Sequence, residues 1–77
     1  PHLRVQLMAT VRFELEGDYV ELNQLLKLVG LCGSGGIGKQ IVASGAVSVD
    51  GRQELRKTAK IRTGQKVSVD DVTILVG

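Results

Sequence analysis

A glycine-rich run followed by a lysine comes closest, in this sequence, to a motif for cofactor chemistry. Residues 33–38 read Gly-Ser-Gly-Gly-Ile-Gly and Lys39 follows. The run satisfies the dinucleotide pattern G-x-G-x-x-G and most of the P-loop pattern, but Gln40 stands where the P-loop needs Ser or Thr to hold magnesium. Both motifs also require a preceding strand and several βα units, whereas residues 22–29 have helical spacing and the chain has 77 residues. Nucleotide binding is therefore a minor alternative.

The residues able to act as nucleophiles, bases or metal ligands are too scattered to form a site. His2 is the only histidine and Cys32 the only cysteine. Because no histidine stands near Cys32 to activate it, we interpret Cys32 as a small buried apolar residue. Asp70 and Asp71 are adjacent, which suits a turn better than an acid–base pair. We expect no catalytic residue, metal site or cofactor, and hence no enzyme. A single cysteine also favours the cytoplasm.

Positive charge is concentrated in the second half of the chain. The net charge is +2, yet residues 31–69 carry seven Lys and Arg against two Asp and Glu, a local charge of +5. Such a concentration favours a polyanionic partner, although a solvated basic face remains an alternative. No stretch approaches the roughly 20 apolar residues of a membrane span, and no signal peptide or small-molecule substrate is expected.

The candidate contacts to a phosphate backbone are long cations from several elements. They are Lys27, Lys39, Arg52, Arg56, Lys57, Lys60 and Arg62. Gly35, Gly36 and Gly38 would let a phosphate approach the free amides at a helix N-terminus. Close packing of two helices explains these glycines equally well.

The number of aromatic residues distinguishes recognition of single-stranded RNA by base stacking from recognition of structured RNA. Phe13 and Tyr19 are the only aromatic residues, too few for a platform on which single-stranded bases stack. Recognition is therefore expected to depend on the charge and shape of structured RNA. Four to six neutralised phosphates would give a log–log dependence of affinity on salt with a slope of about −3 to −5.

The first part of the chain predicts a strand and a helix that position these cations. Every second residue from Leu3 to Glu16 is apolar, which is the period of a half-buried strand. Apolar residues at positions 22, 25, 26 and 29 predict a helix over 20–29. Asn23 and Lys27 would lie on its polar face, and Gly30 would end it.

A second short helix and several strands are predicted after the glycine-rich run. Ser34 is the expected N-cap of a helix over 35–44, with Ile37, Ile41 and Val42 facing inward and Gly45 at its end. Residues 46–50 read as a strand followed by an Asp-Gly turn. Residues 52–60 read as a loop with a short strand, 63–65 as a turn, and 67–69 and 72–76 as two alternating strands.

Taken together, residues 20–70 resemble the αL RNA-binding motif, and most closely its small stand-alone bacterial members. The most specific match is Gly45-Ala46-Val47-Ser48-Val49-Asp50-Gly51, followed by Lys60-Ile61 and the turn at Gly64 with Val67 downstream. Further matches are Val20-Glu21-Leu22, Leu25-Leu26-Lys27-Leu28, Ser34-Gly35 with Lys39, and Glu54-x-Arg56-Lys57. In the broader family an arginine commonly follows the serine, whereas this chain has Gly35 there, so Lys39 carries the charge of that helix.

This resemblance implies an α+β fold in which two short helices pack on a small, mostly antiparallel sheet with an added N-terminal strand. Residues 1–77 would form a single domain. The implied function is non-catalytic binding of structured RNA, ribosomal or tRNA-like, by a monomer. An adaptor whose basic face binds an acidic protein is the main alternative, and duplex DNA is a lesser one.

Overall fold

Alternating apolar residues assemble into a five-stranded sheet that forms one layer of the fold. The computed structural model describes residues 9–77; the predicted strand residues Leu3 to Met8 lie outside this range. The sheet order is β1 (Ala9–Phe13), β7 (Val72–Val76), β6 (Lys66–Val69), β3 (Val47–Val49) and β4 (Arg52–Gln53). β1 runs parallel to β7 and the other pairs are antiparallel, which confirms the predicted sheet with its added N-terminal strand.

Tight turns with left-handed backbone join the antiparallel strands. Asp50 and Gly51 have φ of 52° and 87°, and Asp70 has φ of 51°, a conformation that aspartate tolerates better than most residues. The Asp50 carboxylate accepts hydrogen bonds from the Lys66 backbone N–H at 3.0 Å and from Gln65 Nε2 at 3.2 Å. These bonds lower the pKa of Asp50 from its ordinary value of 3.8. The hairpin turn predicted at residues 50–51 is thus confirmed.

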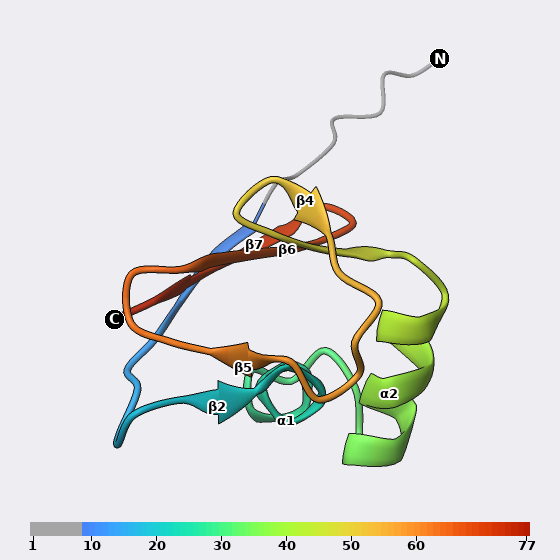
Figure 1. Cartoon of the computed structure of the whole chain (residues 1–77), viewed down its shortest axis with the longest axis horizontal. Coiled ribbons are helices and arrows are strands. Elements are labelled where there is room, and N and C mark those ends of the chain that lie inside the picture. The colour runs from blue at the N-terminus through green and yellow to red at the C-terminus, as the bar shows by residue number, and fades with distance from the viewer. Residues whose placement is uncertain (1–8) are drawn as a thin grey trace.

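A second layer lies across the core from this sheet. It contains helix α1 (Leu22–Leu28) and a two-stranded ribbon in which β2 (Val20–Glu21) pairs antiparallel with β5 (Lys60–Ile61). Helix α2 (Gly35–Ala43) lies at one end of the molecule (Figure 1). The helix predicted from residue 20 begins instead at Leu22, because Val20 and Glu21 are extended to pair with β5. Two-residue strands carry no periodic signal in sequence.

The helix ends follow the expected capping chemistry. Gly30 has φ of 85°, and the N–H groups of Gly30 and Leu31 donate to the carbonyls of Lys27 and Leu26 at 3.0 and 2.9 Å, the Schellman arrangement. Ser34 caps α2 by accepting from the Ile37 N–H at 3.2 Å. Gly45, with φ of 88°, ends that helix. The end residues predicted at Gly30, Ser34 and Gly45 are confirmed.

The core lies between the two layers and is entirely aliphatic. Its fully buried members include Leu22, Leu25, Leu26, Val42, Val47, Ile61, Val67 and Ile74. Two predictions about the helix faces were wrong: Ile37 is 47% exposed rather than inward-facing, and Asn23 is only 2% exposed rather than on a polar face. Both errors arise because α2 turns Gly35, Gly38 and Val42 toward α1, so Asn23 lies at the contact between the helices and Ile37 faces outward.

Candidate nucleic-acid interface

Glycines permit an unusually close contact between α1 and α2. A Cβ placed on Gly38 would lie 2.5 Å from the Asn23 carbonyl oxygen, and one on Gly35 would lie 2.6 Å from Gln24 Nε2. Asn23 Nδ2 donates to the Gly35 carbonyl at 3.3 Å, while no group among residues 9–77 donates to Asn23 Oδ1. Gly38 therefore has a packing role, because its neighbour is backbone, whereas the close neighbour of Gly35 is the end of the flexible Gln24 side chain. Gly36 is exposed, and a Cβ there would make only ordinary contact with Ser34 Oγ at 3.9 Å.

The residues at 56–62, which we call the basic segment, are fixed to the second layer through their backbone. The carbonyls of Lys57 and Ala59 accept from the first-turn N–H groups of Asn23 and Leu22 at 3.1 and 2.8 Å. Ala59 and Ile61 point into the core, with 7% and 1% exposure. Because these two side chains face inward, the cations around them face outward.

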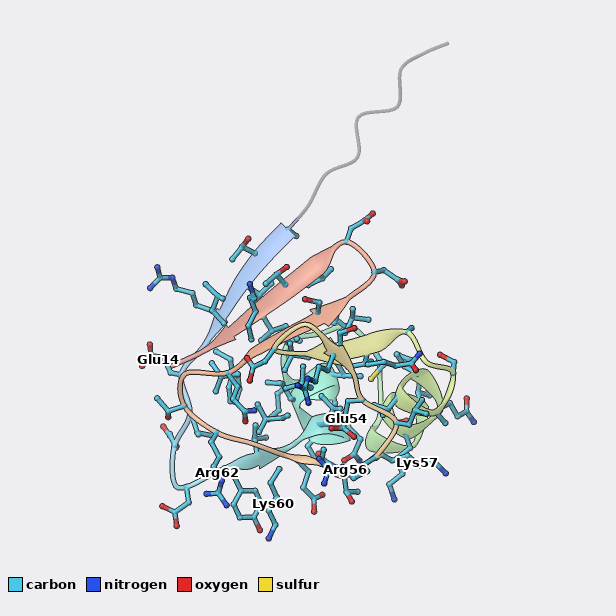
Figure 2. All side chains as sticks on the ribbon, turned by 45° about the horizontal axis from the view of Figure 1, so that its top comes forward. Glu14, Glu54, Arg56, Lys57, Lys60 and Arg62 are labelled. Atoms are coloured by element: carbon cyan, nitrogen blue, oxygen red, sulfur yellow. The ribbon has the colours of Figure 1, made fainter. Side chains whose placement is uncertain are left out.

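Four exposed cations consequently follow one edge of the molecule. Arg56, Lys57, Lys60 and Arg62 lie in a row along this edge in Figure 2. A hollow of about 410 Å³ opens among them and is lined by Arg56, Thr58, Ala59 and Lys60. The arrangement offers an anion several donors on an ordered backbone.

Glu54 partly neutralises the first of these cations. Its carboxylate accepts from Arg56 Nε at 3.0 Å, from Arg56 Nη2 at 3.1 Å and from the Arg56 backbone N–H at 2.9 Å. These bonds lower the pKa of Glu54 and raise the pKa of Arg56. The Arg56 side chain is nevertheless 80% exposed, so its outer face remains accessible to an anion.

The Tyr19 ring lies against the cations Lys60 and Arg62 at the C-terminal end of the basic segment. Lys60 Nζ lies 4.9 Å from the centroid of the ring and Arg62 Cζ lies 5.7 Å from it, both within cation–π range. Arg62 Nη1 also donates to the Asp18 carbonyl at 3.4 Å. Sequence reasoning missed this cluster, because Tyr19 meets Arg62 only through the pairing of β2 with β5.

The remaining predicted contacts occupy three different elements. Lys27 is exposed in the last turn of α1. Lys39 is exposed on α2 itself. Arg52 lies in β4, which Figure 1 places across the core from β5. The structure therefore gathers four predicted cations on the basic segment and sets Arg52 apart from them.

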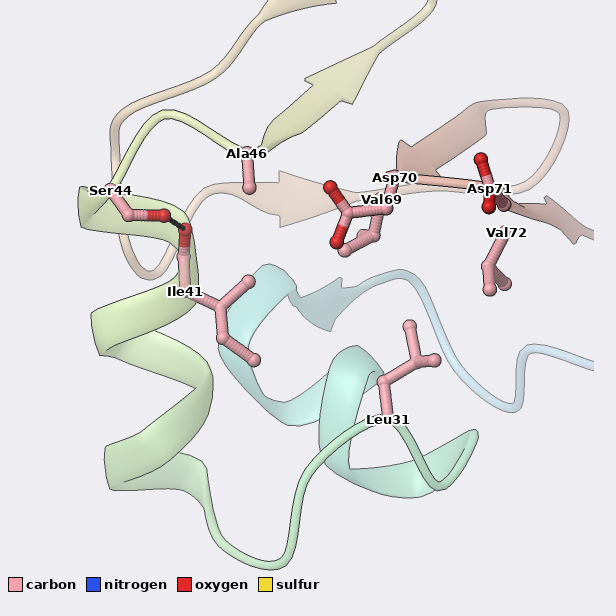
Figure 3. A pocket seen from close by; sticks show the side chains of 8 residues that line it. All are labelled: Leu31, Ile41, Ser44, Ala46, Val69, Asp70, Asp71 and Val72. Atoms are coloured by element: carbon pink, nitrogen blue, oxygen red, sulfur yellow. Dashed lines mark hydrogen bonds between the residues drawn. The ribbon is translucent and has the colours of Figure 1, made fainter.

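A second groove is bordered by acidic and apolar side chains instead of cations. Its volume is about 450 Å³, and it lies between the end of α2, Leu31 and the β6–β7 turn. Figure 3 shows Asp70 and Asp71 beside the apolar side chains of Ile41, Val69 and Val72 at this groove. Carboxylates there would repel phosphate. Within residues 9–77 no cluster of His, Cys, Asp and Glu suits a metal ion, and no helix is long and apolar enough to cross a membrane.

Comparison with known proteins identifies the family. The model of the S4 domain matches residues 13–77, which include both helices, strands β2 to β7 and the basic segment. The chain belongs to the S4 domain family. Within this S4 domain, the match begins at the last residue of β1 and continues through β7.

Two sequence relatives of this S4 domain are proteins of Escherichia coli and Shigella flexneri. The chain is 52% identical over 50 residues to a protein of Escherichia coli (strain K12) named "Putative RNA-binding protein YbcJ". It is equally similar to the uncharacterized protein YbcJ of Shigella flexneri. Each alignment covers 65% of this chain and 71% of the relative.

A solved structure shares the fold of this S4 domain. The solution structure of YbcJ from E. coli, described as revealing an αL motif involved in RNA binding, matches with a TM-score of 0.61 and 40% identity. The match covers 97% of this chain and 96% of that one. The predicted α+β fold and the predicted family are therefore both confirmed.

Proposed function

We propose that this S4 domain is a non-catalytic, monomeric module that binds the phosphate backbone of structured RNA, ribosomal or tRNA-like, in the cytoplasm. One observation carries the proposal: Arg56, Lys57, Lys60 and Arg62 stand exposed in a row on a backbone tied to α1 and β2. Because this backbone is already ordered, binding requires only the ordering of side chains. RNA binding ascribed to YbcJ supports the same function.

The proposed interface extends from the basic segment toward the start of α2. Lys27 on α1 and Lys39 on α2 add charge, and exposed Gly36 leaves room for a phosphate near the first amides of α2. Gly35 lies beside the Asn23 and Gln24 side chains at the same helix start. Arg52 adds long-range attraction from β4 rather than a contact shared with Lys60.

The test is a salt-dependent titration of a fluorescently labelled RNA hairpin, followed by anisotropy. Wild-type affinity should fall between about 50 and 200 mM salt with a log–log slope of about −3 to −5. Changing both Lys57 and Lys60 to Ala should weaken binding at least tenfold at low salt and reduce the magnitude of the slope by about 2, one for each lost phosphate contact.

Lys66→Ala provides a matched control. Lys66 is an exposed lysine on β6, so its loss changes the net charge without touching the basic segment. Lys66→Ala should weaken hairpin binding by at most about twofold. The proposal fails if affinity is independent of salt, or if Lys66→Ala weakens binding as much as the double change of Lys57 and Lys60. Binding of an acidic protein in place of the hairpin would favour the adaptor interpretation.

A further inference from the structure

The ribbon of β2 and β5 has one buried face and one solvent-facing face. The register pairs Val20 with Ile61 and Glu21 with Lys60. Since side chains alternate along a strand, Val20 and Ile61 share the inner face. Tyr19 and Glu21 share the outer face with Lys60 and Arg62.

The Tyr19 ring lies outside the aliphatic core. It is 41% exposed, and among the described residues the core and the apolar side chains packed against it do not include it. Its recorded ring contacts are with the cations Lys60 and Arg62, at 4.9 and 5.7 Å from the centroid. An exposed aromatic ring flanked by two cations presents both parts of a nucleotide-binding surface, a stacking plane and phosphate donors.

We propose that Tyr19 stacks against one unpaired base of the bound RNA while Lys60 and Arg62 contact the phosphates on either side of that base. This inference rests on the proposed function and adds a local RNA feature to it. The ligand is a structured RNA with a single unpaired nucleotide at the edge of its paired region. One ring accommodates one base, because the other aromatic residue, Phe13, is half-buried on β1 against the core.

The position of the ring explains why the base would lie next to a duplex. Lys60 lines the same hollow as Arg56, and its Nζ also lies over the Tyr19 ring. Phosphates held along the basic segment would therefore lead directly to the ring. Stacking of one base on an exposed ring is expected to strengthen binding about fivefold to tenfold.

Intrinsic fluorescence reports on this contact directly, because Tyr19 is the only tyrosine and the chain has no tryptophan. The experiment compares three RNA hairpins: one with a single 3′ adenosine overhang, one with an abasic nucleotide at that position, and one with a blunt end. We expect the adenosine hairpin to quench tyrosine emission and to bind about fivefold to tenfold more tightly than the abasic hairpin. The abasic hairpin carries the same phosphates as the adenosine hairpin, so the affinities of the two should depend on salt with the same log–log slope.

Two substitutions separate stacking from a structural role of the ring. With labelled RNA, Tyr19→Phe should retain the preference for adenosine over the abasic nucleotide, whereas Tyr19→Leu should abolish it and leave affinity for the abasic hairpin unchanged. Leu28→Ala is the control, since Leu28 is an exposed apolar residue on α1 at 58% exposure. Leu28→Ala should change neither the preference for adenosine over the abasic nucleotide nor the affinity for the abasic hairpin.

Each remaining outcome counts against the inference. If the three hairpins bind equally and emission does not change, stacking is refuted while RNA binding by the basic segment stands. If Tyr19→Leu weakens binding to all three hairpins alike, the ring only positions Lys60 and Arg62. If no hairpin binds, the proposed function itself fails.

Discussion

Gly38→Ala should destabilise the domain by separating its two helices. The new Cβ would lie 2.5 Å from the Asn23 carbonyl oxygen and 3.2 Å from both the carbonyl carbon and Cα of Asn23. These are backbone atoms of α1, so no side chain can move aside. Overpacking costs about 1–3 kcal/mol, and a backbone contact places this case near the upper end. Alanine recovers about 1 kcal/mol of helix propensity, so the expected net loss is about 2 kcal/mol.

Urea unfolding followed by circular dichroism measures this loss. A domain of this size unfolds with a slope of about 1 kcal/mol per M urea, so the midpoint should fall by about 2 M. Gly36→Ala is the matched control, because its Cβ would meet Ser34 Oγ at only 3.9 Å. It should stabilise the domain by about 0.5 kcal/mol. A Gly38→Ala protein as stable as wild type would refute the argument that the glycine is required for helix contact.

Three further predictions concern hydrogen bonds and charge. Asp50→Asn should remove the stability that comes from the lowered pKa of Asp50. Because the folded pKa lies below 3.8, that stability is complete above about pH 4 and is lost as pH falls through the folded pKa; a melting-temperature difference that does not vary with pH would contradict this. Glu54→Gln should release Arg56 and tighten hairpin binding about twofold to threefold, with a salt slope steeper by about 1. Fluorescence anisotropy measures this affinity, and an unchanged value would contradict the idea that the Glu54 bonds restrain Arg56. Asn23→Ala should cost about 1–2 kcal/mol, through loss of its bond to Gly35 and a small cavity, and an unchanged urea midpoint would count against that contact.

Much of the fold follows from periodicity and from residues with special backbone preferences. Alternation identified β1, β3, β6 and β7 of the main sheet, and the Asp50-Gly51 pair identified a hairpin whose φ values are both positive. Ser34 and the two glycines at 30 and 45 marked helix ends that the structure confirms. These signals are local, so a single sequence contains them.

The errors lie where packing between elements decides the outcome. Asn23 has the polarity of a surface residue, yet it is buried because Gly35 and Gly38 bring α2 against it. Ile37 has the polarity of a core residue, yet those same glycines occupy the inward face of α2 and leave it exposed. The pattern of residues along one helix does not indicate which of its faces will pack against the neighbouring helix.

The candidate site was predictable in its residues but not in its arrangement. Charge density pointed to the cations of the basic segment. Their outward orientation depends on Ala59 and Ile61 being buried and on carbonyls bonded to the first turn of α1. The placement of Tyr19 against Lys60 depends on a ribbon of two residues per strand, too short to leave a period in the sequence.

The parallel pairing of β1 with β7 has a consequence for the order in which the domain forms during synthesis. β1 is the first strand of the described chain to leave the ribosome, and its partner β7 is the last. The hairpins β3–β4 and β6–β7 close through tight turns, so each forms as soon as its own residues emerge. β1 must wait for nearly the whole domain, and closing so long a loop is entropically costly. We therefore expect β1 to dock late and to contribute little to the folding transition state, so substitutions in it would mainly accelerate unfolding.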